Sequence, residues 1–185
     1  MKKGTFGYIN QRKKSQLLKS ILAFFIAFSI LIFGYLINKN SMQNIFTILG
    51  MLAVLPATKV LISYIVVLPY HSVKQEAYDE VSAVKGEADQ LLTDLVLTSA
   101  QKVMNLSFLL VKEDKLIGLS EHKKASEQYI QEYLQRLIDG RALPFKVKIT
   151  KNYSAFLSEI SNENDVVIEN KDMEELHNLI MSLLV

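Results

Sequence analysis

The chain has 185 residues, of which 50% are hydrophobic, with a mean hydropathy of +0.18 and a net charge of +2 at pH 7. The small net charge gives no reason to expect a nucleic-acid partner. The sequence contains no cysteine, which excludes disulfides, thiolate metal sites and cysteine nucleophiles and suits a reducing compartment. The hydrophobic residues are concentrated between positions 20 and 70, which indicates a membrane segment followed by an ordinary globular domain.

Two apolar stretches predict a transmembrane hairpin. Residues 20–37 contain no charged side chain, and Lys19 and Lys39 flank them. At about 1.5 Å rise per residue, a helix over this stretch nearly crosses a hydrocarbon core of about 30 Å. A secretory signal peptide is the competing interpretation, but a second apolar stretch follows at residues 44–70 and no small-x-small cleavage pattern separates the two. We therefore expect two antiparallel helices joined by the short polar segment 38–43.

The second apolar stretch is interrupted by Pro56 and Lys59. Counting about 20 residues of span from Asn44 places Lys59 about one turn inside the far boundary, from which its amine reaches the headgroups. In the alternative interpretation, Pro56 kinks the helix and Lys59 faces a polar cavity or lines a path in a channel-like oligomer. Gly34 and Gly50 would also allow the close helix packing that self-association through the spans requires.

The distribution of basic residues predicts the orientation of the hairpin. The segment before the first span has no acidic residue, and the loop between the spans carries only Lys39. The basic residues of the N-terminal segment are Lys2, Lys3, Arg12, Lys13, Lys14 and Lys19. The positive-inside rule therefore places both the N-terminus and, after two spans, the C-terminal part in the cytoplasm. In this basic cytosolic arm, residues 1–19, we expect Arg12, Lys13 and Lys14 to contact anionic lipid headgroups.

Residues 20–70 thus form the expected hairpin, and residues 71–185 predict a compact cytosolic domain. Helical and alternating patterns follow each other in the order α-β-β-β-α-β-α-(β)-α. The expected elements are a helix over 72–92, strands over 93–98, 103–111 and 116–120, and a helix with Gly140 as a left-handed stop. They continue with a strand over 145–150, a short helix capped by Asn152, a last strand over 165–169 and a terminal helix capped by Asp172. The second strand alternates, with Met104, Leu106, Phe108 and Leu110 on one face. Strands covered by helices predict a small α/β (α+β) domain with a mixed sheet of about four strands.

The tripeptide Glu121-His122-Lys123 follows the third expected strand, where the order α-β-β-β-α-β resembles the core of the restriction-endonuclease-like fold. The resemblance implies that Glu121 helps to hold Mg²⁺ while Lys123 orients the attacking water. The position of the family's aspartate falls near Asn105, and no acidic residue lies between Thr98 and Glu113. A membrane-tethered, metal-dependent nuclease or phosphodiesterase, or an inactive relative, is therefore an alternative function. It requires a second acid close to Glu121, for which the candidates are Glu76, Glu80 and Asp94.

The sequences GYINQRKKSQL and ILGMLAVLPATKV resemble uncharacterised two-pass membrane proteins of Gram-positive bacteria, which implies a bacterial plasma membrane and no particular activity. His71, His122 and His177 have no metal-ligand spacing and there is no glycine-rich phosphate loop, so we expect neither a metal nor a cofactor. The lysines of residues 146–151 suit the solvated face of an edge strand, or else an edge that binds a partner. We favour a non-enzymatic function, in which a membrane-anchored α/β domain contacts the lipid bilayer and acts as a protein-interaction module or accessory subunit of a membrane complex.

Overall fold

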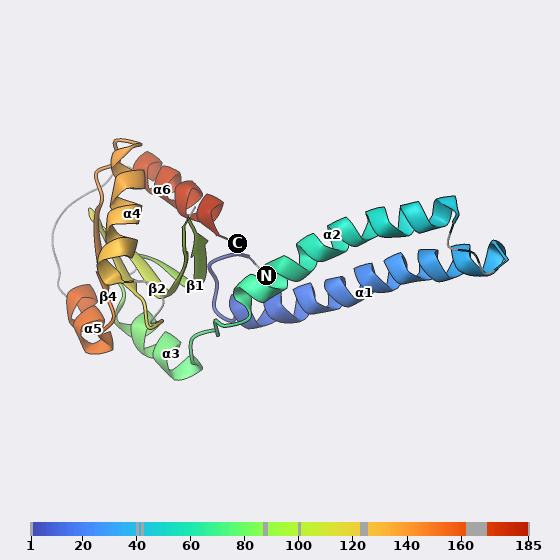
Figure 1. Ribbon diagram of the computed structural model, residues 1–185. Coiled ribbons are helices and arrows are strands. Elements are labelled where there is room, and N and C mark those ends of the chain that lie inside the picture. Colours follow the sequence, from blue (N-terminus) through green and yellow to red (C-terminus); the bar gives the residue numbers. More distant parts are fainter. Residues whose placement is uncertain are drawn as a thin grey trace. The chain divides into compact units, whose positions relative to one another are not determined.

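The computed structural model of the chain describes residues 2–39, 41, 43–86, 89–99, 101–122, 126–161 and 170–184. Within these residues the chain forms six helices and a four-stranded sheet (Figure 1). It divides into two compact units, of which one comprises Asn10–Pro69 and the other combines Met1–Ile9 with Tyr70–Val185.

The first unit is a pair of long helices, α1 (Tyr8–Ile37) and α2 (Ile45–Val67). Their most apolar windows have mean hydropathies of 2.5 and 2.1, and only 17% and 11% of the residues in those windows are buried. Asn44 begins α2 as its cap, because its side-chain oxygen accepts a hydrogen bond from the Thr47 N–H at 3.0 Å. The expected two apolar helices with a short connection are therefore present.

Glycines allow α1 and α2 to approach each other closely. A Cβ atom on Gly34 would overlap the Cβ of Phe46, and one on Gly50 would overlap the side chain of Leu31. The rings of Phe33 and Phe46 also meet edge to face, with centroids 5.7 Å apart. Both glycines therefore serve the packing of α1 against α2 within one chain.

The second unit is the α/β domain, whose sheet has the order β1-β2-β3-β4. Strands β1 to β3 are antiparallel neighbours and β4 pairs parallel to β3, which confirms the expected mixed sheet. Its elements are α3 (Gln75–Val84), β1 (Gln90–Thr98), β2 (Val103–Lys112), β3 (Lys115–Leu119), α4 (Glu127–Asp139), β4 (Lys146–Thr150), α5 (Tyr153–Ser161) and α6 (Asn170–Leu183).

Helices cover both faces of this sheet. The larger apolar cluster joins one face to α4 and α6, through residues such as Leu134 and Ile180. The smaller cluster joins the other face to α3 and α5, through Val81 and Phe156. The domain therefore has three layers, with the sheet in the middle.

Several expected boundaries differ from the structure. The expected helix over 72–92 is wrong at its end, because α3 stops at Val84 and β1 begins at Gln90. The Asp89 carboxylate accepts the Gly86 N–H at 2.8 Å in the turn between them. Gly140 has a right-handed φ of −63°, and the positive φ of 53° lies at Ala142. Asp172 lies in the first turn of α6 rather than at its cap, and the expected strand over 165–169 lies outside the described residues.

The outer edge of β4 is closed by side chains of α4. The N–H groups of Val147, Ile149 and Lys151 donate to the side-chain oxygens of Gln135, Gln131 and Glu127, at 2.8, 3.3 and 3.0 Å respectively. Four helical residues rise about 6 Å and two strand residues about 6.6 Å, so the two sets of groups stay in register. These N–H groups are therefore not free for pairing with another chain.

The first residues of the chain belong to the α/β domain. The Gly4 carbonyl accepts the Thr93 N–H at 3.0 Å, and the Lys3 ammonium donates to the Leu184 carbonyl at 2.7 Å. The Phe6 ring packs against Tyr78 of α3, with centroids 4.8 Å apart. The expected basic arm is thus divided, because its first part contacts the domain and its remainder forms the start of α1.

Candidate functional site

The side chains of β1 and β2 change faces in the middle of the sheet. Leu92 and Leu95 both belong to the larger apolar cluster, so Thr93 and Asp94 between them lie on the opposite face. In β2 the same change occurs at Ser107 and Phe108, and Phe108 belongs to the smaller cluster. The expectation that four alternate residues of β2 share one face is therefore wrong. The change brings Asp94 and Ser107 together on the α3 side.

Asp94 is an unusual strand residue. Its φ is +56°, a left-handed conformation that costs a non-glycine residue about 1 kcal/mol. The residue is fully buried, and one carboxylate oxygen accepts the Val73 N–H at 2.9 Å. The other oxygen is buried and has no hydrogen-bond partner among the described residues. A strained backbone that holds a buried carboxylate is typical of functional positions.

Glu121 lies next to Ser107. The Ser107 hydroxyl donates a hydrogen bond to a Glu121 carboxylate oxygen at 2.7 Å. This contact follows from the β2–β3 register, in which Phe108 pairs with Leu119 and Ser107 comes to lie beside the chain that leaves β3. Glu121 is exposed, and its expected partner Lys123 lies outside the described residues.

Tyr153, the first residue of α5, contacts α3. Its hydroxyl donates to the Glu80 carboxylate at 2.8 Å. Burial, this hydrogen bond and the negative charges of Glu80 and Glu121 together raise the pKa of Tyr153 to about 12. Glu80 was one of the three acids expected near Glu121, and both carboxylates act on the same phenol.

The segment between α2 and α3 lies against the sheet. The Tyr70 ring packs against His122 with centroids 4.9 Å apart, and its hydroxyl donates to the Val103 carbonyl at 3.4 Å. Burial raises the pKa of Tyr70. Val73 of this segment therefore contacts Asp94 of β1. Tyr70 contacts Val103 of β2 and His122, which follows β3.

The arrangement is an acidic polar cluster with a phenol at its centre. Within the part of the chain that the structure describes, no group of three or more histidine, aspartate or glutamate side chains could hold a metal ion. Glu80 and Glu121 can accept hydrogen bonds or attract a basic group, and Tyr153 stays protonated at neutral pH. The cluster thus offers hydrogen-bond acceptors and negative charge at the surface.

The membrane residues singled out from the sequence lie on the two long helices. Pro56 is inside α2, and Lys59 is exposed one turn later, so the lysine does not face α1. Arg12, Lys13 and Lys14 lie near the start of α1, where Lys14 is exposed and the other two are half-buried.

Comparisons with protein families, with curated proteins and with solved structures find no match to this chain.

Sequence reasoning missed Ser107, Tyr153 and Tyr70 as members of the site. Ser107 and Asn105 are polar residues within a largely apolar strand, which is a usable signal. The two tyrosines reach the cluster from elements far away in the sequence, and nothing in their local pattern predicts this.

Proposed function

We propose that this chain is a membrane protein of a bacterial plasma membrane, in which α1 and α2 cross the bilayer as a hairpin. The α/β domain lies on the cytoplasmic side as a protein-interaction module or accessory subunit. The observation that carries the membrane part is the exposure of many large apolar side chains along both helices, since soluble proteins rarely leave so large an apolar surface uncovered. Examples are Ile21, Leu22, Phe25, Ile26, Phe28, Ile32, Phe33, Leu36, Ile48, Leu49, Met51, Leu52, Leu55, Ile62 and Ile65.

Separate observations support the orientation and the even number of crossings. Basic residues precede the first span, whereas the loop between the spans carries only Lys39. In addition, Lys3, Gly4 and Phe6 contact the domain that follows the second span. These contacts support an even number of crossings, because a chain that crosses twice returns to its starting side, and the basic residues alone favour the cytoplasm as that side.

Labelling of single cysteines tests the topology, because the natural chain has none. We expect Gln43→Cys, in the loop, to react with a membrane-impermeant maleimide in intact cells. Gln128→Cys, exposed on α4, is expected to react only after the membrane is permeabilised. Labelling of Gln128→Cys in intact cells would show the opposite orientation. Release of the protein from membranes by alkaline carbonate would refute its insertion into the bilayer.

The interaction function is tested by purification of a tagged copy in mild detergent, followed by mass spectrometry of bound proteins. A partner in constant ratio that survives washing supports an accessory subunit. A protein that elutes alone, or only with itself, contradicts it.

The second candidate function is that of a metal-dependent nuclease or phosphodiesterase, and the observation in its favour is that Glu80 hydrogen-bonds Tyr153, whose pKa the negative charge of Glu121 also raises. Its test uses plasmid DNA and bis(p-nitrophenyl) phosphate with Mg²⁺ or Mn²⁺. An enzyme would cleave a substrate and lose the activity in Glu121→Gln. Equal rates for wild type and variant would exclude a role for this carboxylate in catalysis.

A further inference from the structure

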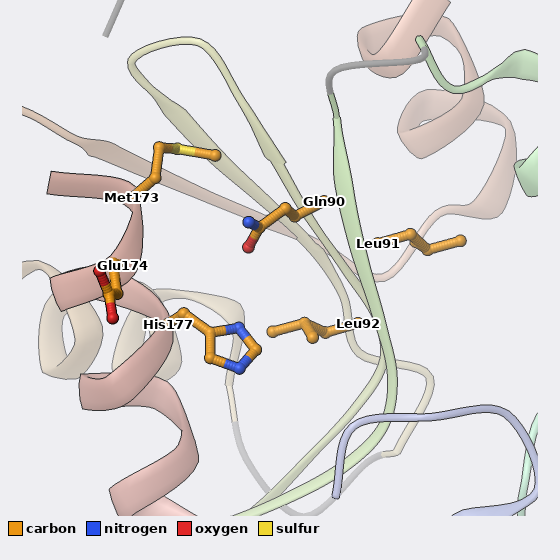
Figure 2. A pocket seen from close by; sticks show the side chains of 6 residues that line it. All are labelled: Gln90, Leu91, Leu92, Met173, Glu174 and His177. Carbon is orange, nitrogen blue, oxygen red and sulfur yellow. The ribbon is translucent and has the colours of Figure 1, made fainter. Parts of the chain in front are cut away.

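A hollow of about 440 Å³ lies between the start of β1 and α6. Its lining consists of Gln90, Leu91, Leu92, Met173, Glu174 and His177, all shown in Figure 2. The hollow is on the opposite face of the sheet from the acidic cluster, because Leu92 belongs to the apolar cluster under α4 and α6. It is therefore a separate surface.

The lining has an apolar floor and an acidic side. Leu92 and Met173 supply the apolar part, and Glu174 supplies a carboxylate with no lysine or arginine beside it in the lining. Glu174 is exposed and has no ion-pair or hydrogen-bond partner among the described side chains, whereas the neighbouring Glu175 faces Arg141 at 3.8 Å. The hollow therefore suits a side chain with an aliphatic stem and a positive end.

The backbone of Leu91 is a free strand edge beside the hollow. Thr93 directs its N–H away from β2, to Gly4, and alternate residues of an antiparallel strand direct their backbone groups the same way. Leu91 therefore also presents its N–H and C=O outward, and no described residue pairs with them. In Figure 2 its side chain points away from Met173, Glu174 and His177, so Leu91 reaches the hollow through its backbone.

We propose that Leu91 and this hollow bind an extended segment of a partner protein that carries a lysine or an arginine. The segment adds to the outer edge of β1, and its basic side chain runs over Leu92 and Met173 to Glu174. The same edge already takes short additions, since Gly4 pairs with Thr93 and Leu184 forms a bridge with Leu97. Strand addition of this kind takes its affinity from backbone hydrogen bonds and its specificity from pockets for alternate side chains.

The position of the basic side chain follows from sheet geometry. Neighbouring residues on adjacent strands place their side chains on the same face. The residue of an added strand that lies beside Gln90 therefore points toward α6, where Met173, Glu174 and His177 line the hollow, and the segment ends beside Leu92 because Gly4 occupies the edge at Thr93. An acidic side chain at that position would meet the Glu174 carboxylate. The inference rests on the proposed interaction function and names its surface and the chemistry of its partner.

The test uses the full chain in lipid nanodiscs and two fluorescent peptides, acetyl-Thr-Val-Lys-Val-Thr and the same peptide with glutamate at the centre. We expect the lysine peptide to bind about tenfold more tightly, measured by fluorescence anisotropy. Glu174→Gln should remove most of this preference, and Glu174→Lys should reverse it. Glu132→Gln, an exposed glutamate of α4, is the matched control and should leave the preference unchanged.

Leu91→Pro tests the backbone part, because proline removes the outward N–H and is tolerated on edge strands. We expect it to abolish binding of both peptides while the circular-dichroism spectrum stays that of the wild type. Equal binding of the two peptides, or a preference that Glu174→Lys does not change, would overturn the proposal. So would a wild type that dimerises through this edge, since a second copy would then be its occupant. If a partner copurifies but neither peptide binds, this inference fails and the interaction function stands.

Discussion

At the scale of single residues, Asp94 is the most unusual position of the site, because it combines a left-handed backbone with a buried carboxylate. The residue links the sheet to the segment after α2, through its bond to the Val73 N–H. Its strain is maintained by the surrounding sheet, in which Leu92 and Leu95 pack on the same face. A residue that can accept the Val73 N–H and tolerate a positive φ is required here, which leaves aspartate, asparagine and few others.

We expect Asp94→Ala to lower the free energy of unfolding by about 2–3 kcal/mol, because it leaves the Val73 N–H without an acceptor and keeps a positive φ on a less tolerant residue. This corresponds to a fall in the melting temperature of about 10 °C. Asp94→Asn keeps an acceptor for the Val73 N–H and a side chain that tolerates a positive φ, so it should lower the melting temperature far less. Thermal melting of the full chain in detergent, followed by near-ultraviolet circular dichroism, measures both. Equal effects of the two substitutions would contradict this account.

Tyr153 predicts a dependence of stability on alkaline pH. Its pKa is about 12 in the folded chain, raised from the ordinary value of 10.0 that applies when the chain is unfolded. The folded state therefore holds the phenolic proton more tightly. The resulting stabilisation is complete below pH 10 and is lost as the pH rises to about 12.

Spectroscopic titration at 295 nm should find a tyrosine in the wild type that ionises near pH 12 and is absent from Tyr153→Phe. The variant should also lose less stability than the wild type between pH 10 and 12. A titration curve that Tyr153→Phe leaves unchanged in this range would show that the pKa of this phenol is not raised to about 12.

At the scale of elements, the edges of the sheet are treated differently. Side chains of α4 close the outer edge of β4, whereas the outer edge of β1 takes Gly4 and Leu184 and leaves Leu91 open. The lysines of β4 suit a solvated edge as expected, and Lys148 also forms an ion pair with Glu159 at 2.6 Å. Protection of β4 thus rests on hydrogen bonds from α4 as well as on charge.

We expect Gln135→Leu to destabilise the domain by about 1–3 kcal/mol and to promote association through β4. The substitution removes the acceptor of the Val147 N–H and the donor to the Phe145 carbonyl, at 2.8 and 3.1 Å. Gln128→Leu is the matched control, because that glutamine is exposed on the same helix and bonds only Glu132. Melting temperature and light scattering report the two effects. If both variants behave alike, the side chains of α4 do not protect the edge.

At the scale of the whole molecule, the sequence predicts what depends on long, regular patterns. The apolar helices, the order of elements and the mixed sheet follow from runs and periods that a single substitution barely alters. Local geometry is harder, because the leucines at positions 91 and 92 fit the end of a helix as well as the start of a strand. The change of faces in β1 coincides with the positive φ of Asp94, which an alternating pattern does not encode. The residues of the site come from segments that are distant in the sequence. Of these residues, the sequence alone pointed only to Glu121 and to a set of candidate acids that included Glu80.

The attachment of the N-terminus to β1 is the feature least visible in the sequence. Gly4 has a φ of +76°, and a Cβ there would lie 3.0 Å from the Met181 side chain. Gly4→Val should therefore force residues 3–6 away from β1 and free the Thr93 N–H, although the substitution lies far away in the sequence.

We expect hydrogen exchange measured by mass spectrometry to become at least about tenfold faster in the peptide that contains residues 90–95, since an opening that costs 1.4 kcal/mol less gives that factor. Exchange in β4 should stay unchanged, because its N–H groups are bonded to β3 and α4. Lys2→Val, an exposed neighbour, is the control. Unchanged exchange at residues 90–95 would mean that the first residues are not held on the sheet. The N-terminus would then be free to act as a basic arm along its whole length, and the contacts of Lys3, Gly4 and Phe6 would no longer support a shared side of the membrane.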